Sequence, residues 1–123
     1  MARLSQPLLV VSLLTASLAL SSCGGGGGVA DARSACRDVT RALATQRRSE
    51  APGLSTGRRN QLENLALAQL LRATPAAAAA TSIDGSWNAL MTTINEAERV
   101  PIPNLVPALT RLCQVADSSS PYL

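Results

Sequence analysis

The sequence has no lysine, no histidine and no phenylalanine, and its aromatic residues are one tryptophan and one tyrosine. Histidine is the most common general base and metal ligand in proteins, so its absence removes the usual basis of acid-base catalysis and of a metal centre. No serine stands in the G-x-S-x-G setting typical of hydrolases. We therefore expect no catalytic residues, no metal site and no enzymatic activity.

Carboxylates are the remaining candidates for acid-base chemistry. Glu96 and Glu98 are close in the sequence, but residues two apart on a helix point in different directions. Glu63 or Asp84 could meet one of them in the fold, although the sequence pattern does not indicate such a pair. We interpret these acidic residues as solvated surface charge.

The net charge is small, and arginine supplies all of the positively charged side chains. From Cys23 onward there are ten arginines and eight carboxylates, which leaves a side-chain balance of +2. This balance is too small to indicate a nucleic acid as partner. Abundant alanine and arginine without lysine are typical of a GC-rich bacterial genome, so we expect a bacterial source.

The hydrophobic segment near the start of the chain is short. Arg3 precedes a run of almost entirely apolar or small residues from Leu8 to Leu20. A membrane-spanning helix needs about 20 such residues, whereas the central region of a signal peptide needs only about 7 to 15. The run therefore predicts an export signal over residues 1–22 and not a retained span.

A cysteine follows this run directly, in the order Leu20-Ser21-Ser22-Cys23. The order resembles the lipobox of bacterial lipoproteins, which has Leu three residues before the cysteine and small residues between. The resemblance implies that a diacylglycerol is joined to the sulfur of Cys23, that the chain is cut before it, and that the new amino group can be acylated. An ordinary secretory peptide cleaved after Ser21, with Ala19 and Ser21 as its small residues, is the alternative.

Lipidation of Cys23 would define the location of the protein. It implies attachment to the cell membrane on the extracytoplasmic face, or to an outer membrane if the source has one. Two or three acyl chains anchor durably where one does not, and the glycines of residues 23–28 predict a flexible tether. We expect no cofactor apart from these covalent lipids.

The cysteine count agrees with this interpretation. Three cysteines are an odd number, which needs an explanation in an exported protein. Lipidation of Cys23 leaves Cys36 and Cys113 as one pair in an oxidising compartment. We therefore expect a disulfide between them.

Apolar residues spaced three or four apart predict a helical domain over residues 29–117. The first helix is expected over about 29–48 and the second over about 56–72. Leucines spread around most of the second helix, so we expect it to be mostly buried and to form the centre of the core; they are Leu62, Leu65, Leu67, Leu70 and Leu71.

Prolines divide the second half of the chain. Thr74-Pro75 is expected to end the second helix and start the third, whose apolar stripe extends to Ala97. Asp84-Gly85-Ser86 lies inside that stripe and could kink or split the helix, since glycine disfavours helix interiors. The fourth helix is expected from Asn104 to about residue 117, and residues 118–123 are expected to be a disordered tail.

Short loops between four helices imply antiparallel neighbours. The predicted fold is all-α: a small up-down-up-down four-helix bundle with one disulfide, preceded by a cleaved signal peptide and a glycine linker. Cys36 near the start of the first helix and Cys113 near the end of the last would then lie at the same height.

Two groups of residues are candidates for binding. The first comprises Arg47, Arg48, Arg58 and Arg59, which flank the first loop at the end far from the anchor. They could dock an acidic envelope protein or an anionic polymer, or they could be dispersed charge on a solvated loop. The second group comprises Trp87, Leu90, Leu67 and Leu70, which could line an apolar pocket between helices, although Trp87 is better explained as a core residue.

The sequence therefore predicts a lipid-anchored, non-catalytic binding or accessory module at the bacterial envelope. The alternative is a carrier or sensor of a small hydrophobic ligand bound between helices.

Overall fold

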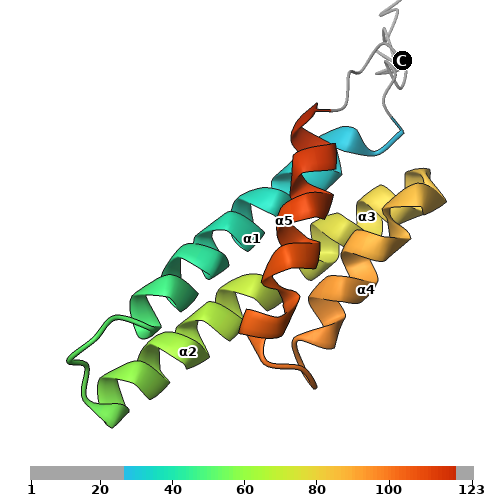
Figure 1. Ribbon diagram of the computed structural model, residues 1–123. Helices are drawn as coiled ribbons and strands as arrows, with labels where there is room; N and C mark the ends of the chain where they lie inside the picture. Colours follow the sequence, from blue (N-terminus) through green and yellow to red (C-terminus); the bar gives the residue numbers. More distant parts are fainter. Residues whose placement is uncertain (1–26, 119–123) are drawn as a thin grey trace, which may run out of the picture.

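The computed structural model describes residues 27–118. The predicted signal peptide, Cys23 and residues 119–123 lie outside this range. Within it the secondary structure is entirely helical, which confirms the all-α prediction (Figure 1). The elements are α1 (Val29–Ser49), α2 (Thr56–Leu71), α3 (Thr74–Ile83), the short 3-10 helix η1 (Gly85–Trp87), α4 (Asn88–Glu96) and α5 (Ile102–Ser118).

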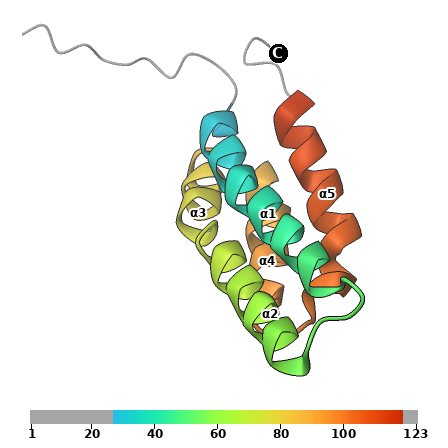
Figure 2. The ribbon, with the colours of Figure 1, turned by 90° about the vertical axis from the view of Figure 1, so that its left-hand side faces the viewer.

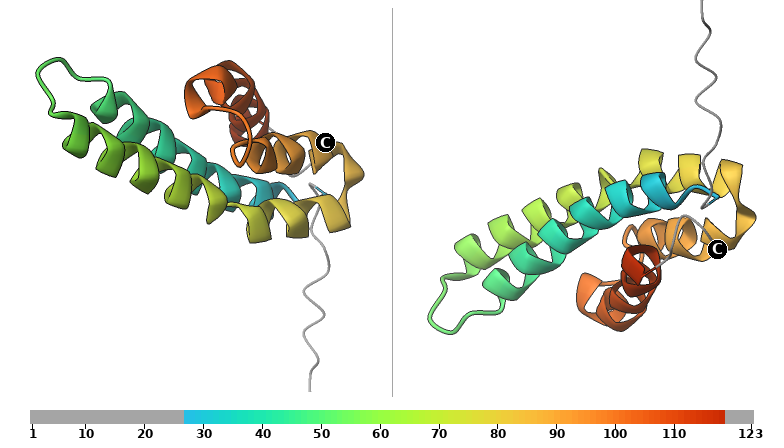
Figure 3. Two further views of the ribbon diagram at one scale, coloured as in Figure 1. Left: turned by 90° about the horizontal axis from the view of Figure 1, so that it is seen from below. Right: turned by 90° about the horizontal axis from the view of Figure 1, so that it is seen from above.

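The helices form an up-down-up-down bundle. α1 lies beside both α2 and α3, α4 runs back along α3, and α5 packs against α1 and α4 (Figures 1 and 2). Since α2 and α3 follow one another in nearly the same direction, they make up one of the four antiparallel segments. Figure 3 shows α5 nearly end-on where α1 is seen along its length, so α5 crosses α1 obliquely.

The turn between the second and third segments is not where the sequence suggests. Arg72 (φ −63°, ψ −21°) and Ala73 (φ −73°, ψ −17°) both keep helical backbone angles, and Pro75 lies in the first turn of α3. No residue there leaves the helical region, so the chain bends without reversing. The reversal occurs at Asp84, whose backbone is extended (φ −142°, ψ 112°). The break at Asp84-Gly85 is therefore the turn that joins the second and third segments.

The core is centred on α1, and the prediction that the second helix is its centre is wrong. α1 contributes ten buried residues and packs against α2, α3 and α5. On α2 only Leu62, Ala66 and Leu70 are buried, and Leu65 is 42% exposed. Small side chains on α1, such as the fully buried Ala32 and Ala42, let neighbouring helices approach closely from more than one side.

A disulfide joins the first and last helices, as the sequence predicts. The Cys36 and Cys113 sulfurs are 2.11 Å apart and the two Cα atoms 5.5 Å apart. Both residues are buried in the core. The bond fixes the start of α1 to the last turns of α5.

The last two glycines of the predicted tether belong to the fold. Gly28 caps α1 with a left-handed backbone (φ 83°), and its carbonyl accepts the N–H of Ala32 at 2.9 Å. A Cβ at Gly28 would lie 2.7 Å from the carbonyl oxygen of Ala80. The carbonyl of Gly27 accepts the Nε1–H of Trp87 at 2.8 Å. Gly27 and Gly28 are therefore part of the folded domain.

Candidate functional site

An exposed group of arginines occupies one end of the molecule, at the hairpin between α1 and α2. Two of its members end α1 and two begin α2, on either side of the loop over residues 50–55. This end is opposite the one where the chain enters the fold at Gly27 (Figure 2). We call this group the arginine tip; its residues are Arg47, Arg48, Arg58 and Arg59, and all are exposed.

Local sequence builds this end. Ser55 caps α2, and its Oγ accepts the backbone N–H of Arg58 at 3.1 Å. Pro52 and Gly53 shape the loop, and Gly53 has a left-handed backbone (φ 83°) that favours glycine. The sequence prediction that these arginines flank one loop at the far end of the bundle is confirmed.

The arginines of the tip are not neutralised by neighbours. Elsewhere Arg41 pairs with Asp38 at 3.0 Å and Arg99 pairs with Glu96. Within residues 27–118 no arginine of the tip forms a salt bridge, and the guanidinium of Arg58 donates a long hydrogen bond of 3.5 Å to Gln61. The tip therefore presents four guanidinium groups to solvent, none of them in an ion pair with the described residues.

Two of these arginines stand where helix electrostatics disfavours them. The positive end of a helix dipole is at its N-terminus, where cations are unfavourable. Arg58 and Arg59 lie in the first turn of α2, which holds no acidic residue. Arg47 and Arg48, at the C-terminus of α1, are placed favourably. The stability of α2 therefore does not account for the two arginines at its start.

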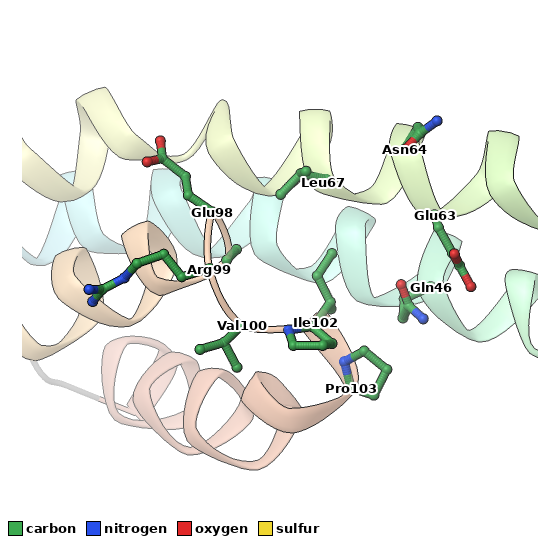
Figure 4. A pocket seen from close by; sticks show the side chains of 11 residues that line it. Gln46, Glu63, Asn64, Leu67, Glu98, Arg99, Val100, Ile102 and Pro103 are labelled. Atoms are coloured by element: carbon green, nitrogen blue, oxygen red, sulfur yellow. The ribbon is translucent and has the colours of Figure 1, made fainter.

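A cavity of about 400 Å³ lies between the end of α1, the middle of α2 and the loop from α4 to α5 (Figure 4). Its apolar lining includes Leu67, Ala97 and Ile102. Glu63 and Glu98 lie on its rim, and Gln46, almost fully buried, donates to Glu50 at 3.3 Å. The loop from α4 to α5 and the first residues of α5, together residues 97–103, form one wall.

The residues suggested for an apolar pocket differ in their surroundings. Leu67 lines the cavity just described, whereas Trp87, Leu90 and Leu70 are core residues exposed by 7%, 0% and 0%. Trp87 lies in η1 with its indole N–H on the carbonyl of Gly27. Its role as a core residue is confirmed.

A second hollow lies along the groove between α1 and α5, and the sequence pattern did not predict it. Two smaller cavities of about 220 Å³ and 310 Å³ share Thr40 and Asp117 in their linings. The spacing of four between Arg33, Arg37 and Arg41 is the signal that could have indicated it, since these residues line the larger of the two.

One acidic residue, Asp84, accepts a hydrogen bond from within its own turn. Asp84 has a pKa below its ordinary value because the backbone N–H of Ser86 donates to its Oδ1 at 2.9 Å. This bond caps η1 and leaves Asp84 exposed in the turn. In the described part of the chain no three histidine, cysteine or acidic residues are grouped to hold a metal ion.

The described helices include none that is long and apolar enough to cross a membrane.

No protein-family model matches the chain, and comparisons with curated proteins and with solved structures found no similar one.

Proposed function

We propose that this protein is a lipid-anchored bacterial envelope protein, without catalysis of its own, that binds a negatively charged partner through the arginine tip. One observation carries the proposal: four exposed arginines, without salt bridges to the described residues, are gathered at the end of the bundle opposite the chain entry. The lipobox would put the anchor before that entry, which leaves the tip directed away from the membrane.

The electrostatics of the tip favour contact with a dense array of negative charge. At physiological ionic strength charges are screened beyond about 8 Å, so a partner must come close to all four arginines to gain from them. An acidic protein surface or an anionic polymer meets this condition. Charge complementarity of this kind mainly raises the association rate and the specificity.

The test compares two variants with the same change in net charge. In the tip variant Arg47, Arg48, Arg58 and Arg59 are replaced by serine. In the control variant four other exposed arginines are replaced; these are Arg37, Arg72, Arg99 and Arg111. Binding to poly-glutamate and to polyglycerol phosphate is measured for both variants and for the unchanged protein.

We expect the tip variant alone to lose affinity. Exposed ion pairs contribute about 0.2–1 kcal/mol each, so loss of four weakens binding by about fourfold to several hundredfold. Poly-glutamate represents an acidic protein and polyglycerol phosphate represents a wall polymer. The probe with the higher affinity indicates which of the two is the better ligand. Equal losses in the tip and control variants would show that only net charge matters and would refute a defined site.

The anchor is tested separately on the full chain produced in a bacterium. Mass spectrometry should find a diacylglycerol on Cys23, and Cys23→Ala should move the protein from the membrane fraction to the soluble fraction. Cleavage after Ser21 with an unmodified thiol would instead support the ordinary secretory signal.

A carrier of a small hydrophobic ligand is the second candidate, and the cavity at Leu67 is the observation that favours it. Its volume of about 400 Å³ lies at the lower end of the range of ligand sites. Native mass spectrometry of the protein after export should then show a bound molecule, and Leu67→Trp, which fills the cavity, should remove it. An empty protein would count against this function.

A further inference from the structure

Very little chain separates the predicted anchor from the folded domain. Because Gly27 and Gly28 are part of the fold, only residues 24–26 stand between Cys23 and Gly27. An extended chain covers at most about 3.3–3.6 Å per residue. The Cα of Gly27 therefore lies no more than about 14 Å from that of Cys23, whatever path the chain takes.

Several elements meet at the point where the chain enters. The indole N–H of Trp87 donates a hydrogen bond to the carbonyl of Gly27 at 2.8 Å, so the turn between α3 and α4 lies beside Gly27. Arg33 donates from Nε to the carbonyl of Ala116 at 3.0 Å, which brings in the last turn of α5. We call this face the proximal end; it comprises residues 27–28, 83–87 and 116–118 (Figures 1 and 2).

An apolar side chain projects from the proximal end. Ile83 is 61% exposed, more than the other large exposed hydrophobic residues, Leu65 and Val115. It is next to Asp84, and a Cβ at Gly27 would lie 2.8 Å from the Oδ2 of that residue. An isolated exposed apolar residue is ordinary, but this one lies beside the point from which the anchor extends.

The charged residues distinguish two orientations in which the domain could contact a bilayer, end-on through the proximal end or sideways along the flank of α1. The proximal end carries Asp84 and Asp117, with Asp31 and Arg33 in the adjoining first turns of α1, so anionic head groups do not attract it. The flank of α1 carries Arg37 and Arg41, of which Arg41 is already paired with Asp38. End-on contact thus depends on the short tether and Ile83, whereas a domain lying on its flank would depend on salt-sensitive attraction.

We propose that the proximal end rests on the phospholipid bilayer that holds the anchor, with Ile83 at the interface and the arginine tip directed outward. α1 has 21 residues and is about 31 Å long at 1.5 Å per residue, so the tip stands about that far from the surface. This inference rests on the proposed lipidation of Cys23 and adds the face of the domain that touches lipid.

The single tryptophan of the chain makes the test direct, because its fluorescence reports on the proximal end alone. The full chain, lipidated in a bacterium and checked by mass spectrometry, is reconstituted into phosphatidylcholine vesicles containing phosphatidylglycerol and a lipid with a spin label on its head group. A control variant, Trp87→Phe with Leu54→Trp, moves the reporter to the loop at the arginine tip.

We expect the spin label to quench Trp87 strongly and the relocated tryptophan of the control variant hardly at all, equally in low and high salt. Ile83→Asp should weaken the quenching of Trp87 without releasing the protein from the vesicles. Equal quenching of both reporters that fades in high salt would mean that the domain lies on its flank, and would overturn the proposal.

Failure of the anchor and failure of the orientation give different results. A protein mass without lipid would overturn the lipid anchor and this orientation together. Lipidated protein bound to vesicles whose Trp87 is not quenched would overturn the orientation alone.

Discussion

Removing the Cys36–Cys113 disulfide should cost a large part of the stability of the domain. The two residues are 77 positions apart, and the chain-entropy model assigns a loop of this length about 4.5 kcal/mol. Domains as a whole are stable by only about 5–15 kcal/mol. Replacing both cysteines by alanine should therefore remove roughly a third or more of the total.

The arrangement of the helices indicates where the loss should appear first. α5 makes its main contacts with α1 and α4, and the disulfide is its covalent link to α1. Pro107 lies inside α5 and lacks the N–H of a regular helix position. Without the crosslink, α5 should open at lower free energy than α1, α2 and α3.

The assay is urea unfolding of the double alanine variant followed by circular dichroism, together with hydrogen exchange of the α5 amides. The unchanged protein after chemical reduction is the control, and it should lose a similar amount. A variant within about 1 kcal/mol of the oxidised protein at an unchanged denaturant slope, with slow exchange retained in α5, would refute the reasoning.

Three further predictions concern single residues. Gly28→Ala should destabilise more than Gly53→Ala: both positions have φ 83°, but only at the first would the new Cβ meet a backbone carbonyl, at 2.7 Å. The shared left-handed conformation costs alanine about 1–2 kcal/mol, so equal losses in urea unfolding would contradict the contact. Arg58→Glu should raise the free energy of unfolding by about 0.3–1 kcal/mol, because α2 has no acidic residue in its first turn; a lower melting temperature would argue against this. The pKa of Asp84 should lie below its ordinary value of 3.8 because a backbone amide of η1 donates to the carboxylate. The stability that this gives is present above the unfolded pKa and is lost as the pH falls through the folded one, so Asp84→Asn should flatten the acid limb; a carboxyl titration by NMR at or above 3.8 would contradict it.

Much of the fold was predictable because it follows from local pattern. The stripes of α1 and α5 place Cys36 and Cys113 on buried faces, and helices joined by short loops become antiparallel neighbours. The position of the arginine tip follows in the same way, since its residues flank one loop. The cavity at Leu67 was not predictable, because its walls come from three segments far apart in the chain.

The sequence by itself determined most of the helical segments, the partner of each cysteine in the disulfide and the end of the bundle that carries the arginines. Each depends on the spacing of residues close together in the chain, or on a count of cysteines. Only the tertiary structure decided that the chain reverses at Asp84 and not at Thr74-Pro75, because both sites contain helix-breaking residues and only packing selects between them. It also decided that Gly27 and Gly28 join the fold, since Trp87 and Ala80, which hold them, lie more than fifty residues away in the sequence.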